Sequence, residues 1–191
     1  MAKKLIIFIF LTMFIAALSV FFQRSKPQLP EKPSAFGGAS PRIHIENINI
    51  FRYTESKLNS ITSAQEAKLF EPNLLILKGS VNAESYKDDG SLDAMRSQVA
   101  TALFEADGIS QMIEGSEIDR IVFQKDVQFA LGSMDIKTEQ AIYHPKTNYL
   151  SSRKKVKVST SGRDARADGG FTLNLDVERL RMRGQVDGVF N

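Results

Sequence analysis

The stretch RIHIENINIF, residues 42–51, alternates apolar and polar side chains and so decides the class of fold. Successive side chains of a β-strand point to opposite faces, so this alternation predicts a half-buried strand. The apolar positions are Ile43, Ile45, Ile48 and Ile50. The phase slips at Glu46-Asn47, which indicates a bulge or a bend within the strand.

The rest of the chain after residue 42 follows the same pattern, with turns marked by glycine, asparagine and aspartate. Leu74–Val81 is a nearly continuous apolar run, and Asp88-Asp89-Gly90 is a hairpin turn signal. Residues 65–70 and 107–114 could each contain a helical turn, but neither reaches the length of a stable helix. Further strands are predicted at residues 100–105, 118–124, 127–131, 138–143, 155–159, 171–176 and 180–186.

A weak internal repeat underlies these strands. Its unit runs from an alanine, through a turn, to a second strand that ends in valine, as from Ala67 to the KGSV of residues 78–81 and from Ala141 to Val158. Residues 180–186, LRMRGQV, close the chain much as residues 75–81 do. Stacked units of this kind would bury one continuous interior, although short hairpins can also resemble one another by chance.

The eighteen residues Leu5–Phe22, LIIFIFLTMFIAALSVFF, carry no charge and follow Lys3 and Lys4. At about 1.5 Å per residue they would form a helix of roughly 27 Å, close to the ~30 Å hydrocarbon core of a bilayer. The alternative is a cleaved secretory signal, whose apolar region is typically about 7 to 15 residues long. The greater length here favours an uncleaved anchor in residues 1–22, with the remaining chain exported.

Two further regions follow the predicted anchor. Residues 23–41 contain four of the six prolines and the pair Gly37-Gly38, which is typical of a tether without a hydrogen-bonded ladder. Residues 42–191 have the length of one domain. The net charge of +3 is spread along the chain apart from RKKVK at residues 153–157, which is typical of a solvated strand face. No nucleic-acid-binding motif is recognisable.

The sequence offers no support for catalysis. His44 and His144 are the only histidines, and neither has a second ligand at metal spacing or a serine nucleophile motif beside it. Asp88, Asp89 and Asp93 fail the twelve-residue pattern of a calcium loop. No phosphate-binding glycine loop is present, so we expect no enzyme activity, no metal and no cofactor.

Taken together, an N-terminal anchor, a Pro-rich tether, alanine-to-Gly-x-Val hairpins and the terminal pattern GGF-x-L-x-L … L-x-M-x-G-x-V resemble the LptC family. These are the bitopic periplasmic components of the lipopolysaccharide export machinery. The resemblance extends over nearly the whole chain and implies an all-β fold: a twisted, slightly open β-jellyroll of antiparallel hairpin units, preceded by one transmembrane helix. It also implies an inner-membrane location, single-pass through residues 5–22, with the C-terminal domain in the periplasm.

The function implied by the resemblance is to accept the acyl chains of lipopolysaccharide from an inner-membrane ABC transporter complex and to pass them to a periplasmic jellyroll bridge protein. The lining would be Leu75, Leu77, Val81, Phe104, Ile121, Phe123, Val127, Phe129, Tyr143, Val156, Val158, Phe171, Leu173 and Leu175. The early strand would face the transporter through Ile43, Ile45, Ile48 and Ile50, and the late strand would pair with the bridge protein through Met182, Gly184 and Val186. The alternative is a membrane-anchored envelope scaffold whose β domain binds only proteins and whose interior is filled.

Overall fold

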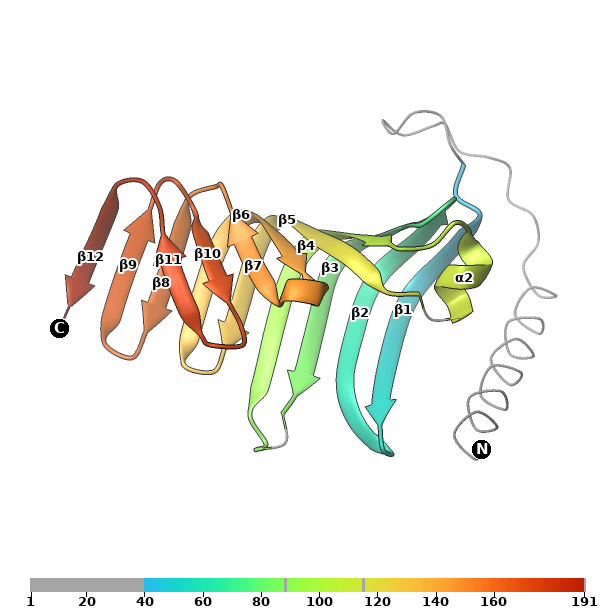
Figure 1. Ribbon diagram of the computed structural model, residues 1–191, viewed down its shortest axis with the longest axis horizontal. Coiled ribbons are helices and arrows are strands. Elements are labelled where there is room, and N and C mark those ends of the chain that lie inside the picture. Colours follow the sequence, from blue (N-terminus) through green and yellow to red (C-terminus); the bar gives the residue numbers. More distant parts are fainter. Residues whose placement is uncertain (1–39, 88, 115, 191) are drawn as a thin grey trace. The chain divides into compact units, whose positions relative to one another are not determined.

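The computed structural model describes residues 40–87, 89–114 and 116–190. The predicted anchor and almost all of the predicted tether lie outside these ranges. Among the described residues, no helix has both the length and the apolar character needed to cross a membrane. Residues 41–191 form one compact unit, with β1 at one end of the body and β12 at the other (Figure 1).

The described residues form twelve strands of a single sheet in which every pairing is antiparallel. The long strands are β1 (Ile43–Thr54), β2 (Lys57–Phe70), β3 (Leu74–Tyr86), β4 (Leu92–Phe104), β5 (Ile118–Leu131) and β6 (Met134–His144). The short strands are β7 (Tyr149–Ser152), β8 (Val156–Thr160), β9 (Arg163–Ala167), β10 (Phe171–Asn174), β11 (Arg179–Met182) and β12 (Val186–Phe190). Two short helices, α2 (Ile109–Glu114) and the 3₁₀ turn η1 (Pro145–Thr147), interrupt them. The all-β prediction is confirmed.

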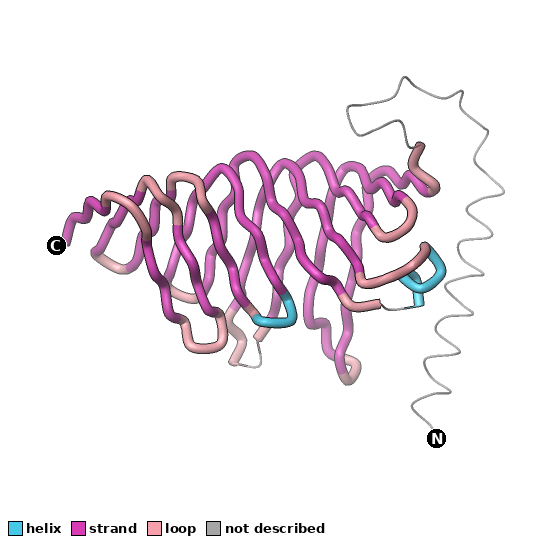
Figure 2. The backbone as a smooth tube through the Cα atoms, turned by 45° about the horizontal axis from the view of Figure 1, so that its top comes forward, coloured by secondary structure: helices cyan, strands magenta, loops and turns pink. Residues whose placement is uncertain are grey.

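The sheet forks at β6. One end of this strand, Ile142–His144, pairs with β7, whereas its other end, Asp135–Thr138, pairs with β8. Beyond the fork the order is β7-β10-β11 in one arm and β8-β9-β12 in the other. The turns lie at the two margins of the sheet, with the strands crossing between them (Figure 2). Among the described strands, no pairing joins the first to the last ones, so the sheet is open, as predicted.

A line of irregularities bends the long strands near their middle. Residues with positive φ stand at this level in three strands: Asn47 in β1, Gly79 and Ser80 in β3, and Lys125 and Asp126 in β5. The pairing register shifts by one residue at the same level in all four pairs from β2–β3 to β5–β6. Such bulges bend a strand and increase its twist. Asn47, at the predicted bend, is the first member of this line, which we call the crease and which crosses the long strands β1–β6; the β1–β2 pairing keeps its register there.

The predicted hairpin turn after β3 is confirmed. The Asp89 carboxylate accepts hydrogen bonds from the Ser91 backbone N–H at 2.9 Å and from the Ser91 hydroxyl at 2.6 Å. Gly90 has a φ of +81° and donates its N–H to the Lys87 carbonyl at 3.0 Å. The helical turn expected within residues 107–114 is α2, whereas the one considered at residues 65–70 is wrong because these residues belong to β2.

Two strand predictions need correction. Residues 118–124 and 127–131 are one strand, β5, because the Lys125-Asp126 pair makes a bulge rather than a turn. Residues 180–186, predicted as one strand, are divided between β11 and β12, which lie in different arms of the fork. The turn that separates them contains Gly184, whose φ is +83°.

Candidate functional site

The inward face begins at the crease with a row of small and β-branched residues. Val81 and Val127 directly follow the positive-φ residues of their strands and are fully buried, and Val156 opens β8 at 3 % exposure. The register continues this row from Val127 through Thr138 and Val156 to Ala167. Val81 and Val127 thus mark the bulges in β3 and β5, and Val156 continues their row at the start of β8.

A second row lies two to four residues from the crease and alternates large and small side chains. The cross-strand neighbours are Ala67, Leu77, Ala100, Phe123 and Ala141, all buried. Cross-strand neighbours lie about 4.5–5.5 Å apart at Cβ, so a large residue beside a small one fills the space without crowding. The alanine that begins each predicted unit therefore makes room for a larger neighbour.

The interior is closely packed from β5 onward. Phe171 and Ile136 are fully buried, and Leu150 and Leu173 are 2 % exposed. The rings of Phe123 and Phe129 stand on opposite sides of the crease in β5 and meet edge to face, with centroids 5.5 Å apart and an interplanar angle of 78°. This pair brings the two parts of β5, on either side of the crease, into direct contact.

Toward β1 the same inward face is less covered. Ile45, Ile48, Leu75 and Met95 pack against the core cluster but remain only partly buried. Ile50, further along β1, is 42 % exposed. The inward face is therefore continuous and apolar across the sheet, packed at the β7–β10 end and partly open to solvent at the β1–β4 end.

Thirteen of the fourteen predicted lining residues belong to one apolar cluster. The buried members are Leu77, Val81, Phe123, Val127, Phe129, Val156, Val158, Phe171 and Leu173, and the half-buried members are Leu75, Ile121, Tyr143 and Leu175. Phe104, at the end of β4, is half-buried and lies outside this cluster. These thirteen residues therefore share one interior. Only the half-buried ones have exposed surface that a ligand could contact without repacking of the interior.

The predicted docking residues divide in the same way. Ile45, Ile48 and Met182 are part of the apolar cluster, whereas Val186 is 50 % exposed on β12. Gly184 lies in the turn before β12, where an added Cβ would stand 2.0 Å from the Asp168 carboxylate and 2.7 Å from the Gly169 backbone nitrogen. A Gly184→Arg variant would consequently disturb this turn as well as any docking surface.

Several residues of the interior were not predicted from the sequence. They are Ala67, Ala100, Ile136, Ala141, Leu150 and Ala167. The alternation Met134-Ile136-Thr138 is a signal that could have found Ile136. The alanines carry little apolar surface of their own, and their burial depends on the large neighbours that the register sets beside them.

Buried hydroxyl groups stabilise the fork at β6. Thr138 donates to the Lys155 carbonyl at 2.9 Å and lies 3.2 Å from the Ser152 hydroxyl, while Ser152 accepts from the Lys154 N–H at 2.9 Å. These bonds satisfy polar groups where the sheet divides and regular pairing stops. Nearby, burial and the Asp176 carboxylate raise the pKa of Tyr143, whose hydroxyl donates to Asn148 at 2.9 Å. The phenol therefore stays neutral.

The described residues contain no group of three or more His, Asp or Glu side chains placed to hold a metal ion. Two depressions on their surface are bordered mainly by polar and charged residues. The most extensive feature of the described residues is the apolar inward face, which ends at the open edges of the sheet.

Comparison with known proteins identifies a family that the C-terminal part of the chain matches. Residues 118–191 match the family described as "Lipopolysaccharide-assembly, LptC-related". This match confirms, for that part of the chain, the resemblance to the LptC family. No curated protein sequence matches the chain.

The fold itself has a solved counterpart. LptH of Pseudomonas aeruginosa, described as the LptA homologous periplasmic component of the lipopolysaccharide transport device, superposes with a TM-score of 0.51 at 12 % identity. The match covers 69 % of this chain and 94 % of LptH. At this identity the likeness establishes the fold, an open jellyroll of the LptA type.

Proposed function

We propose that this protein takes part in lipopolysaccharide transport as a membrane-anchored periplasmic component that accepts acyl chains on its apolar inward face. The observation that carries the proposal is the continuous inward face of residues 41–190, partly open at β1–β4, in a chain whose residues 118–191 match an LptC-related family. Acyl chains crossing water need such a surface, since each buried methylene is worth about 0.8 kcal/mol.

The half-buried inward residues are the proposed points of lipid contact. Leu75, Met95 and Ile121 already pack on the core on one side, so an acyl chain can cover their remaining surface without opening the packed end. Phe171 and Val127, by contrast, have no exposed surface to offer. We therefore place the lipid on the inward face near β1–β4, beside the packed β7–β10 end.

The free edges are the proposed docking surfaces for proteins. Within the part of the chain that the structure describes, β1 pairs only with β2, β11 only with β10 and β12 only with β9, which leaves three free strand edges. Such edges can accept strands from a partner. In our proposal β1 faces the ABC transporter complex and the forked end faces the jellyroll bridge protein, while residues 5–22 hold the protein at the inner membrane.

One observation favours the second candidate, a membrane-anchored envelope scaffold whose β domain binds only proteins. The filled interior around Phe171, Ile136 and Leu150 is what a scaffold requires. The two candidates differ in what contacts the inward face near β1, because a scaffold has no use for lipid there.

Photocrosslinking from an inward and an outward position distinguishes the candidates. Met95 is a half-buried inward residue of β4, whereas Arg120 of β5 is exposed on the opposite face and lines neither surface depression. With a photoreactive amino acid at each position in turn, the proposal predicts capture of lipopolysaccharide in cells from position 95 and not from position 120. Equal capture at both, or capture only of proteins from position 95, would contradict lipid binding.

A further inference from the structure

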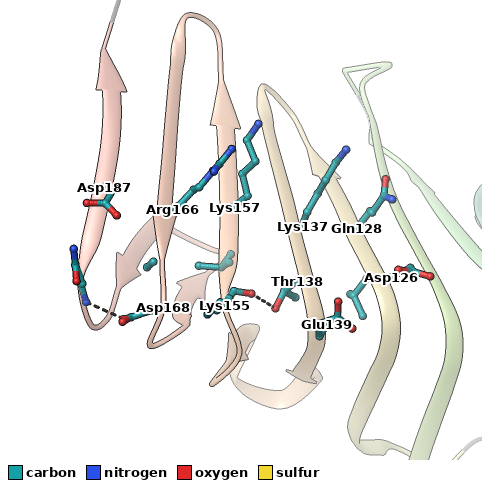
Figure 3. A pocket seen from close by; sticks show the side chains of 14 residues that line it. Asp126, Gln128, Lys137, Thr138, Glu139, Lys155, Lys157, Arg166, Asp168 and Asp187 are labelled. Carbon is teal, nitrogen blue, oxygen red and sulfur yellow. Dashed lines mark hydrogen bonds between the residues drawn. The ribbon is translucent and has the colours of Figure 1, made fainter.

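A row of cations crosses the outer face of the sheet, on the side opposite the apolar interior. Lys137 in β6 stands directly opposite Lys157 in β8, which stands directly opposite Arg166 in β9. Their side chains project to the same side of the sheet (Figure 3). Neighbouring strands lie about 4.8 Å apart, so the three positions span about 10 Å.

The charges in this row are only partly neutralised by the other described residues. The Lys157 ammonium lies 2.9 Å from the Asp164 carboxylate. Among the ion pairs of the described residues, none involves Lys137 or Arg166, although Asp187 stands opposite Arg166 on β12. Like charges directly opposite one another destabilise a sheet. A bound anion would relieve this repulsion.

The row lines a depression in the surface. It has a volume of about 690 Å³, and Lys155 and Gln128 also border it. A second depression, of about 490 Å³, shares Asp126 and Gln128 with the first and extends over Arg96 and Asn82. The register places Arg96, Gln128 and Lys137 in line with the row. We call these two adjoining depressions the outer furrow; polar and charged residues border it from Asn82 in β3 to Asp187 in β12.

The furrow mixes cations with groups that accept hydrogen bonds. Asp126, Glu139 and Asp187 border the first depression together with the cations. Phosphates suit ammonium and guanidinium groups, whereas the hydroxyls of a sugar need carboxylate or amide acceptors. Acceptors among the cations would weaken a site for bare phosphate, but they suit a saccharide that bears phosphate groups.

We propose that this furrow binds a phosphorylated oligosaccharide, with its phosphates on Lys137, Lys157 and Arg166 and its hydroxyls on the flanking acceptors. Identifying the source as the sugar portion of lipopolysaccharide rests on the proposed function. The site itself does not, because it lies on the face opposite the acyl-binding interior.

The test uses the full-length protein in detergent and lipopolysaccharide from which the acyl chains have been removed. Calorimetry would compare the wild type with Lys137→Gln/Arg166→Gln and with the control Lys57→Gln/Arg179→Gln, which removes two exposed charges elsewhere. Charge-assisted hydrogen bonds support an expected loss of affinity of at least about tenfold in the first variant and none in the control. Removing the phosphates from the ligand should weaken wild-type binding similarly.

Three outcomes would overturn the proposal: equal affinity of both double variants, unchanged affinity for the dephosphorylated saccharide, or pyrophosphate binding as tightly as the saccharide. Thermal melts in phosphate-free buffer show that a loss of affinity is not a loss of folding. Relief of repulsion should leave the melting temperature of Lys137→Gln/Arg166→Gln at or above the wild-type value. Because the ligand has no acyl chains, failure here leaves the Met95 crosslinking result, and with it the proposed function, untouched.

Discussion

Replacing Phe171 by alanine tests whether the β7–β10 end is a filled support. Phe171 is fully buried and stands between Ser152 of β7 and Met182 of β11 in the register. Phe→Ala changes in packed cores cost about 3–5 kcal/mol. A domain is typically stable by about 5–15 kcal/mol, so this change should remove a large fraction of the free energy of unfolding. At about 2–4 °C per kcal/mol for a chain of this size, the melting temperature should fall by roughly 6–20 °C.

The assay is urea unfolding followed by circular dichroism, because the chain has no tryptophan to report on the core. Val177→Ala is the control, since Val177 is 66 % exposed, and its unfolding free energy should stay within about 0.5 kcal/mol of wild type. The half-buried Leu75→Ala should fall between the two. If Phe171→Ala unfolds at the same urea concentration as Val177→Ala, the interior at β10 is not packed and the division into a filled and an open end is wrong.

The remaining predictions concern the fork, a glycine and one carboxylate. Ser152→Ala should lower the free energy of unfolding by about 1–2 kcal/mol by removing the acceptor of the Lys154 N–H, and a melting temperature equal to wild type would refute the role of these bonds. Gly170→Ala should be more damaging, because its φ is +88° and a Cβ would lie 2.1 Å from the Ser152 carbonyl oxygen; a soluble variant with wild-type stability would contradict this. The hydrogen bond from Lys68 is the main cause that lowers the pKa of Glu66 below its usual value. Glu66 should thus stabilise the fold above the unfolded-state pKa and lose this effect as pH falls through the folded-state pKa, so urea midpoints between about pH 5 and 3 should fall less steeply in Glu66→Gln.

The sequence predicted the class of fold because alternation is a local signal. A few residues are enough to predict the strand that contains the isoleucines of residues 42–50 and the aspartate-glycine turn after β3. The predicted repeat ends its units at Val81 and Val158, but the row of Val81, Val127 and Val156 along the crease depends on the register between neighbouring strands. The sequence of a single strand does not determine its register with its neighbours.

The fork and the outer furrow could not be predicted for the same reason. Residues 180–186 look like one strand, yet Gly184 has a φ that breaks it and sends β11 and β12 into different arms. The cluster at residues 153–157 was interpreted as a solvated face, and only the pairing of β6, β8 and β9 aligns Lys157 with Lys137 and Arg166. The predicted lining residues also differ in burial, because Leu75 is half-buried whereas Phe171 is fully buried.

The central claim is that acyl chains lie on the inward face near β1–β4, and a spin label tests it most directly. The chain has no cysteine, so single cysteines at Ala83, inward beside Met95, and at Arg120, on the opposite face outside both depressions, give uniquely labelled proteins. Added lipopolysaccharide should immobilise the label at position 83 and move it into an apolar environment, while the label at position 120 stays unchanged. Unchanged spectra at position 83 at saturating lipopolysaccharide, or equal changes at both positions, would contradict the account.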